Sequence, residues 1–183
     1  MRIRTATDLD WPQIFPFFAM IVQAGQSYAY PIGLPTDQAR ELWMERAPGR
    51  TVVAEREGRI VGSAKMGPNR PGRGDHVATA SFMVDPAAAG GGIGRALGEH
   101  VIGWAREAGY RAIQFNAVVE TNIAAVALWR SLGFMVIGTV PGAFRHPQHG
   151  FVGLHVMHLN LTAPYRVAPG AADSDVDGGT DAH

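Results

Sequence analysis

The sequence predicts a single α/β domain, of the α+β kind, in which helices flank a central, twisted and mostly antiparallel mixed sheet. Three observations lead to this prediction. Short alternating apolar segments follow one another before residue 85, a glycine-rich loop opens a segment with helical spacing, and strands and helices then alternate to residue 161. The chain has 183 residues, enough for one core. We therefore expect one domain over residues 1–161.

The segment before the glycine run is expected to contain four strands and two helices. A strand at 2–7 precedes a helix at 11–25, for which Asp8 and Asp10 are N-cap candidates. Pro16 falls inside that helix and predicts an interruption or a kink. The other expected elements are a helix at 37–47, strands at 50–56 and 59–67 around a two-residue turn at Glu57-Gly58, and a strand at 76–84.

The segment after the glycine run is expected to alternate helices and strands. Apolar residues recur at helical spacing from Ile93 to Ala108, and Gly109 supplies a C-terminal stop. The other expected elements are a strand at 111–119, a helix at 121–132, and strands at 134–140 and 153–161. From residue 167 the chain consists mainly of small and acidic residues and has no aromatic residue. Residues 162–183 are therefore predicted to form a flexible acidic tail.

Composition narrows the expected partners and compartment. Sixteen Lys and Arg side chains balance sixteen Asp and Glu side chains, so no net field attracts nucleic acid or an anionic membrane. The chain has no cysteine, which excludes disulfides, thiolate metal sites and cysteine nucleophiles. No segment is long and apolar enough to cross a bilayer. A cytoplasmic protein without nucleic-acid or membrane partners is therefore expected.

Four glycines, Gly90–Gly92 and Gly94, directly precede a predicted helix. Backbone N–H groups at a helix N-terminus attract an anion, and missing side chains allow it to approach closely. The spacing excludes a P-loop, because Arg95 and Ala96 stand where Lys and Ser or Thr are required. It also lacks the G-x-G-x-x-G pattern of a dinucleotide-binding loop. The remaining option is a loop for the pyrophosphate of an acetyl-CoA enzyme.

The segment "FMVDPAAAGGGIGRAL" resembles motif A of the GNAT N-acetyltransferases, a strand ending in Val-Asp-Pro followed by Gln/Arg-x-x-Gly-x-Gly/Ala and a helix. Gly92 and Gly94 match the fixed glycines, whereas Ala89 replaces the family's Gln or Arg, with Arg95 as a substitute. "TNIAAVALWRSLGF" is similar to a second family helix. The resemblance covers roughly residues 52–161 and implies a GNAT-like fold, acetyl-CoA as co-substrate and no metal. The cofactor-binding residues that it implies are Met83, Val84, Gly90, Gly91, Gly92, Ile93, Gly94, Arg95, Asn122 and Trp129.

Trp129 stands where many members of this family carry a Tyr that is placed to protonate the departing thiolate. An indole cannot give up a proton usefully at neutral pH. We therefore interpret Trp129 as a half-buried packing residue that lines the cofactor, and no general acid is assigned.

A narrower resemblance is to the GNAT branch that includes L-azetidine-2-carboxylate N-acetyltransferase. The stretches that carry it are "SYAYP", "HVATASFMV", "FNAVVETN" and "GTVPGAFRHPQHG". In that branch, Asn residues on two neighbouring strands serve the substrate and a catalytic water. Asn116 matches one of them and Thr79 stands at the other position. The resemblance thus implies that Asn116 and Thr79 position a water that relays the amine proton, with the N–H of Val84 or its neighbour facing the oxyanion.

Several side chains keep other assignments open. Strand alternation predicts one shared face for Gln114, Asn116, Val118 and Glu120, which makes Glu120 a rival catalytic base or else an exposed charge. Tyr28 and Tyr30 are expected to cover a small substrate or to pack on the sheet. Three histidines could act as bases or ligands but lack a metal-ligand spacing, and none is expected to bind a metal; they are His76, His146 and His149.

The sequence therefore predicts an acetyl-CoA-dependent N-acetyltransferase acting on a small-molecule amine, such as an amino acid or a proline analogue. Two alternatives stay open. A non-catalytic acyl-CoA sensor is favoured by Ala89, Thr79 and Trp129, and a protein or peptide N-acetyltransferase would need an open groove. Many members of the family dimerise, so a homodimer is a further expectation, although no sequence feature marks an interface.

Overall fold

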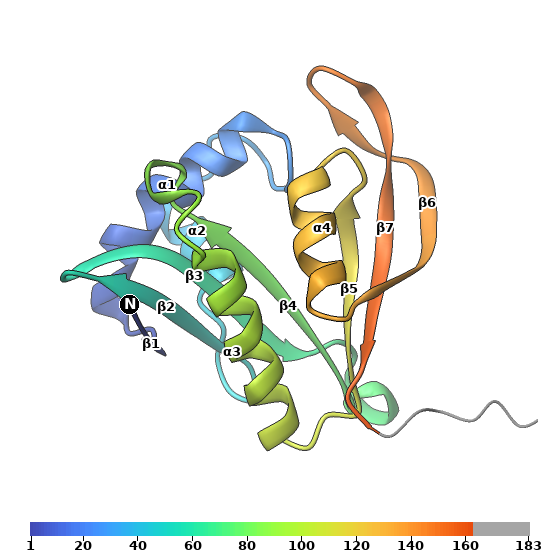
Figure 1. Cartoon of the computed structure of the whole chain (residues 1–183). Helices are drawn as coiled ribbons and strands as arrows, with labels where there is room; N and C mark the ends of the chain where they lie inside the picture. The colour runs from blue at the N-terminus through green and yellow to red at the C-terminus, as the bar shows by residue number, and fades with distance from the viewer. Residues whose placement is uncertain (163–183) are drawn as a thin grey trace, which may run out of the picture.

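The strands form one sheet of seven, and each neighbouring pair is antiparallel except β4 with β5. The computed structural model describes residues 1–162, so nearly all of the predicted tail lies outside the described residues. The sequence prediction of a mixed, mostly antiparallel sheet is confirmed. In spatial order (Figure 1) the strands are β1 (Arg2–Thr5), β2 (Arg50–Arg56), β3 (Arg59–Pro68), β4 (Val77–Val84), β5 (Ala112–Val119), β7 (Gly150–Asn160) and β6 (Met135–His146).

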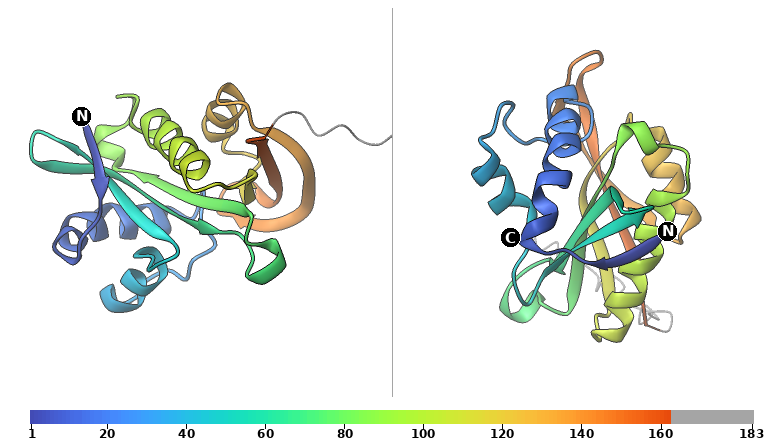
Figure 2. Two further views of the ribbon diagram at one scale, coloured as in Figure 1. Left: turned by 90° about the horizontal axis from the view of Figure 1, so that it is seen from below. Right: turned by 90° about the vertical axis from the view of Figure 1, so that its left-hand side faces the viewer.

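The helices cover both faces of this sheet, as the view from below in Figure 2 shows. One face carries α1 and α2 and buries an apolar cluster around Phe18 and Trp43. The other face carries α3 and α4 and buries a cluster around Leu97 and Phe115. Each helix therefore buries one apolar side, as amphipathic spacing predicts. The helices are α1 (Trp11–Ala24), α2 (Thr36–Trp43), α3 (Ile93–Glu107) and α4 (Ile123–Ser131).

Helix α1 is continuous although it contains two prolines. Pro12 stands in the first turn, where its missing N–H has no intrahelical partner to lose. Pro16 stands inside the helix, where it removes one donor. The expected interruption at Pro16 does not occur, because burial of Ile14, Phe17 and Phe18 holds the helix against the sheet on either side of it.

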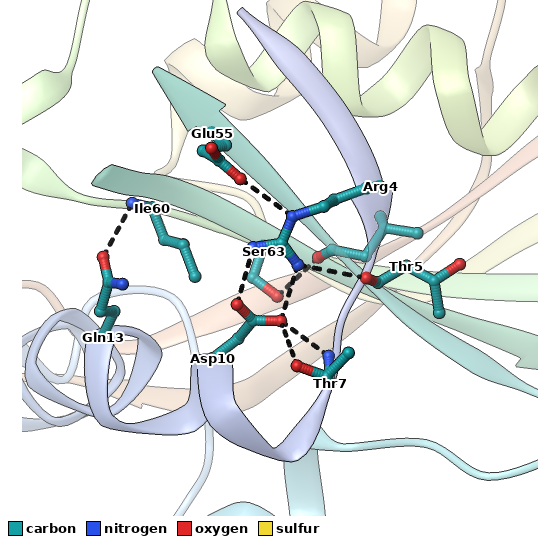
Figure 3. A network of polar contacts seen from close by, with 9 residues as sticks. Arg4, Thr5, Thr7, Asp10, Gln13, Glu55, Ile60 and Ser63 are labelled. Carbon is teal, nitrogen blue, oxygen red and sulfur yellow. Dashed lines mark hydrogen bonds and ion pairs between the residues drawn. The ribbon is translucent and has the colours of Figure 1, made fainter. Parts of the chain in front are cut away.

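A network of polar side chains ties β1 and β2 to the start of α1 (Figure 3). Arg4 donates bonds of 2.8 Å to both carboxylate oxygens of Asp10 and a 2.9 Å bond to Glu55. Asp10 also accepts the Thr7 N–H, so its carboxylate does not cap α1 although it occupies the N-cap position. The Arg4 hydrogen bonds are the main reason why the pKa of Asp10 falls to about 2. The Asp10 carboxylate thus holds the start of α1 to β1 through Arg4.

The alternation of side chains between the two faces of the sheet is broken in β5 by a β-bulge. Between Phe115 and Val118 the register against β7 shifts by one residue. Both side chains consequently pack against the cluster on the α3 side. The expectation that Gln114, Asn116, Val118 and Glu120 share one face is therefore wrong beyond Asn116, because an extra residue reverses the alternation.

The hairpin of β6 and β7 is longer than expected. The strand expected to end at residue 140 continues to His146, and only residues 147–149 form the turn into β7. The ring of His146 is buried, and its Nδ1 accepts the N–H groups of Gln148 and His149 at 3.1 and 3.3 Å. Phe144, on the same extension, lines the large cavity described next. The hairpin thus contributes to the site instead of merely closing the sheet.

Candidate active site

A cavity opens where β4 and β5 separate. These strands pair only near their starts, Val77 with Ala112 and Ala78 with Ile113. Beyond these pairs the strands diverge toward the top of Figure 1. The space between them contains a cavity of about 730 Å³, within the usual range for small-molecule sites. The carboxyl ends of β4 and β5, which pair in parallel, therefore flank a common opening.

Aromatic side chains form one wall of this cavity. Trp129, on α4, is buried, and its ring centroid lies 4.5 Å from that of Phe82 on β4. The centroid of Phe115 on β5 lies 5.0 Å from the same indole. All three side chains line the cavity. Trp129 thus bridges the diverging strands with apolar surface.

Tyr28 occupies part of the open edge of β4. Its hydroxyl donates a 2.7 Å bond to the Phe82 carbonyl and accepts a 3.0 Å bond from the Phe82 N–H. Burial raises the pKa of this hydroxyl above its ordinary value, so it stays protonated at neutral pH. Its ring stacks on Tyr30, with centroids 5.4 Å apart. Backbone alternation directs the N–H of Val84 to the same open side of β4.

The glycine-rich segment forms the turn from β4 into α3. Gly90 and Gly92 have φ angles of 83° and 73°, a left-handed backbone that favours glycine. Asp85 anchors the start of the turn, since its buried carboxylate accepts the Ala87 N–H at 3.0 Å and pairs with Arg59 at 2.9 Å. Residues 89–92 are exposed, so the first N–H groups of α3 are open to an anion without intervening side chains.

Arg56, at the end of β2, lies against this turn and was not expected from the sequence. Its guanidinium donates a 3.1 Å bond to the Gly91 carbonyl. A Cβ at Gly91 would lie 2.8 Å from Nη2 of Arg56, so glycine permits this approach. Arg95, expected to substitute for the side chain missing at Ala89, instead donates a 2.7 Å bond to Ser131. Arg56 and Gly91 are 35 residues apart, and no local pattern joins them.

Polar side chains from separate segments meet beside the apolar wall. Asn116 on β5 donates a 2.6 Å bond to Asn69, which follows β3, and accepts a 2.8 Å bond from Gln114. Thr79 and Asn116 line the large cavity and also a second cavity of about 370 Å³. The structure therefore brings these two predicted residues to one junction. It adds Asn69, which sequence spacing did not indicate, and it places Gln114 beside Asn116, as strand alternation predicted.

Comparison with known proteins bears on this combination of splayed strands and a bare glycine turn. The family described as "Acetyltransferase (GNAT) family" matches residues 13–134. The chain belongs to this family. The matched region of this GNAT acetyltransferase includes α1, the glycine turn, the diverging strands and α4. A curated relative, N-acetyltransferase aca1 of Schizosaccharomyces pombe, is 27% identical over 156 residues, which cover 76% of this chain and 75% of the relative.

Solved structures agree with the family assignment. A GCN5-related N-acetyltransferase from Kribbella flavida is 60% identical, has a TM-score of 0.85, and is matched over 87% of this chain and 97% of that one. The structure of yncA from Salmonella typhimurium with its cofactor acetyl-CoA is 28% identical, has a TM-score of 0.76, and is matched over 93% of this chain and 98% of that one. The predicted enzyme class, an N-acetyltransferase, and the predicted fold are confirmed. The narrower azetidine-carboxylate branch is not.

The remaining residues that were expected to bind the donor differ in burial and in their contacts near the turn. The side chains of Met83 and Ile93 are buried in the two apolar clusters, so only their backbones are open to a ligand. Asn122 lines the large cavity and caps α4 by accepting the Ala125 N–H at 3.1 Å. Gly94 lets α3 approach α4, since a Cβ there would lie 3.3 Å from Leu128.

Glu120 does not lie among the side chains that line either cavity. Its carboxylate accepts a short hydrogen bond from the N–H of Gly153 on β7, and its own N–H donates to the Gly153 carbonyl at 3.0 Å. A Cβ at Gly153 would lie 2.8 Å from this carboxylate. Glu120 therefore joins β5 to β7 just beyond the bulge.

The large cavity is poor in charge. Among its lining residues in the described part of the chain, the only titratable side chains are Tyr28 and Tyr30.

Within residues 1–162, no group of three or more His, Asp or Glu side chains is placed to hold a metal ion. Over the same residues, no helix is both long and apolar enough to cross a membrane.

Proposed function

We propose that this acetyltransferase transfers the acetyl group of acetyl-CoA to the amine of a small molecule, with free amino acids and proline analogues as leading acceptors. The observation that carries the proposal is the junction at Thr79 and Asn116, where an apolar cavity meets a polar one. A thioester in the apolar cavity and an amine in the polar cavity would meet there. Proline analogues are included because of the resemblance of Thr79 and Asn116 to the azetidine-carboxylate branch.

The donor is held mainly by backbone in this proposal. The N–H groups that begin α3 bind the pyrophosphate, and the left-handed turn at Gly90 and Gly92 keeps side chains away from it. Arg56 adds a cation beside the turn, where the family's Gln or Arg is replaced by Ala89. The apolar wall formed by Trp129 and its neighbours covers the pantetheine arm.

The chemistry joins the amine nitrogen to the acetyl carbon and breaks the carbon–sulfur bond. The hydroxyl of Thr79 and the amide of Asn116 hold a water that takes the proton from the attacking nitrogen. The N–H of Val84, on the open side of β4, donates to the carbonyl oxygen as negative charge develops on it. Sulfur leaves as a thiolate, which needs no protein acid because thiols ionise at only moderately alkaline pH. Trp129 at the family's Tyr position is compatible with this route.

Glu120 acts in this proposal as a positioning residue and not as the base. Its carboxylate holds Gly153 on β7 and so fixes the end of β5 after the bulge. Asn116 keeps the face that it shares with Gln114, whereas Glu120, beyond the bulge, lines neither cavity. A relay through Thr79 and Asn116 is therefore favoured over direct proton removal by Glu120.

The test combines ligand binding with turnover. At a hundredfold excess over its dissociation constant, acetyl-CoA should stabilise the folded chain by about 2.7 kcal/mol. For a domain of this size that corresponds to a rise in melting temperature on the order of 5–10 °C. Free thiol released from acetyl-CoA is then measured with amines, amino acids and short peptides.

The outcomes separate the candidate functions. Acetylation of free amino acids or amines supports the proposal. A melting-temperature shift without thiol release from any acceptor favours the sensor module, and release with peptides alone favours a peptide acceptor. The absence of any shift with acetyl-CoA contradicts the donor site itself.

A further inference from the structure

The second cavity lies between the end of α2 and the far half of β3. It shares Thr79 and Asn116 with the large cavity, and Tyr30 also lines both. Its other walls come from the segment 45–49, which leads into β2, and from residues 65–68 of β3. An acceptor whose amine lies at the junction therefore extends its remaining groups into this space.

The charges that line the second cavity do not balance. Lys65 donates a 2.7 Å bond to the Leu42 carbonyl and pairs with the Glu45 carboxylate at 3.1 Å. Arg46 also lines the cavity and is exposed, and within residues 1–162 it has no ion pair. Because Lys65 and Glu45 neutralise each other, the cavity has one uncompensated cation. The large cavity has none.

The backbone around Arg46 is held in place from both sides. Before it, the N–H of Glu45 donates a 2.9 Å bond to the buried hydroxyl of Thr51. After it, Gly49 packs on β3 so closely that a Cβ at Gly67 would lie 3.1 Å from the Gly49 Cα. Two glycines facing each other thus keep the segment 45–49 against the sheet. Arg46 is presented from a fixed backbone and not from a free loop.

We propose that Arg46 binds the carboxylate of the acceptor, so that the substrate is a free amino acid and not a simple amine. This inference rests on the proposed function, since it names the substrate class of the same site. The amine lies at Asn116, and the carboxylate reaches the guanidinium across the second cavity. Guanidinium groups match carboxylates with paired hydrogen bonds, which an amide or a decarboxylated amine cannot provide.

The experiment compares acids with their amides. Thiol release from acetyl-CoA is measured for a panel of free amino acids that includes proline and L-azetidine-2-carboxylate, and for the matching primary amides. Wild type should prefer the acid by at least about tenfold in kcat/KM, the factor expected for one charge-assisted pair. In a primary amide, a larger fraction of the amine is unprotonated and able to attack. The protonation state of the amine alone therefore favours turnover of the amide, which is opposite to the expected preference for the acid.

Variants then assign the preference to one side chain. R46A should lower kcat/KM for the acid by about 10–100-fold and for the amide much less, so that the preference disappears, while R46K should retain part of it. Arg2→Ala, which removes an exposed arginine on β1, should leave the preference unchanged. The KM for acetyl-CoA should stay constant in all three variants.

Two results would overturn the inference, and they are distinguishable from failure of the proposed function. Equal turnover of acids and amides by wild type, or an equal loss for both in R46A, excludes carboxylate recognition by Arg46 while acetyl transfer to small amines stands. Absence of turnover with every free amino acid and amine overturns both proposals, and the melting-temperature shift with acetyl-CoA then shows whether donor binding survives.

Discussion

The two walls of the opening between β4 and β5 are built in different ways. The donor wall, which we define as the glycine turn with α3 and α4, comes from residues 85–107 and 123–131 and presents backbone at the turn and the Trp129 ring from α4. The acceptor wall takes Tyr30, Arg46, Asn69 and Asn116 from separate segments and presents side chains. A donor common to a whole family can be bound by a local motif, whereas selection of an acceptor requires side chains that only the folded chain assembles.

This difference predicts that changes in the acceptor wall alter turnover while donor binding is preserved. Asn116→Ala removes the amide that links Asn69, Gln114 and the junction, and should lower kcat by about 10²-fold or more, the size of a lost proton relay. Acetyl-CoA should still raise the melting temperature as in wild type. Asn160→Ala, at the paired end of β7, is the matched control. An unchanged kcat would show that Asn116 takes no part in the mechanism and that the two walls do not differ in this way.

Changes in the donor wall should have the opposite signature. Gly92→Val places a branched side chain at a left-handed N-cap in front of the first N–H groups of α3, and should weaken acetyl-CoA binding about 30-fold, or about 2 kcal/mol. Calorimetric titration measures the dissociation constant. Gly103→Ala on α3, where an added Cβ meets nothing within 4 Å, should leave it unchanged. If Gly92→Val binds acetyl-CoA as tightly as wild type does, the pyrophosphate binds at another place.

The Arg4–Asp10–Glu55 network, in contrast, lines neither cavity and ties β1 and β2 to the start of α1 (Figure 3). The folded pKa of Asp10, about 2, is below its ordinary value of 3.8, so the ionised carboxylate stabilises the fold above pH 4. That stability is lost as the pH falls toward 2.

Asp10→Asn should therefore cost about 1.5–3 kcal/mol at pH 7 and should flatten the pH dependence of unfolding between pH 4 and 2. Urea unfolding at several pH values measures both effects, with the exposed Asp75→Asn as control. The same slope in Asp10→Asn and wild type would mean that other carboxyls dominate acid unfolding.

The smallest expected effect concerns Arg56, the one side chain that crosses from β2 to the donor wall. Arg56→Ala should raise the dissociation constant of acetyl-CoA by about 3–10-fold, and added salt should reduce the difference, as for an exposed ionic contact. Comparison with 3′-dephospho-CoA separates a contact to the pyrophosphate from one to the 3′-phosphate. Arg73→Ala is the control on a distant turn. If Arg56→Ala does not change acetyl-CoA binding at low salt, the donor wall binds acetyl-CoA without help from this side chain.

Elements with strong local signals were predicted closely. The helix expected from Ile93 corresponds to α3, and the Glu57–Gly58 turn joins β2 to β3 as expected. Pro16 does not interrupt α1, because tertiary burial of its neighbours outweighs one missing hydrogen bond. The length of β6 was underestimated, since Pro141 and glycines resemble loop residues, whereas a register shift between Val140 and Phe144 accommodates them within the strand.

The sequence by itself indicated the mixed sheet through the order of its strands and helices, and it indicated the glycine turn and the acetyltransferase family through short motifs. Only the tertiary structure decided which side chains share the acceptor wall. A one-residue bulge in β5 turned Glu120 toward Gly153 and left Asn116 at the junction, and packing over 35 residues brought Arg56 to Gly91. Such contacts arise from register and packing, which no local pattern of residues encodes.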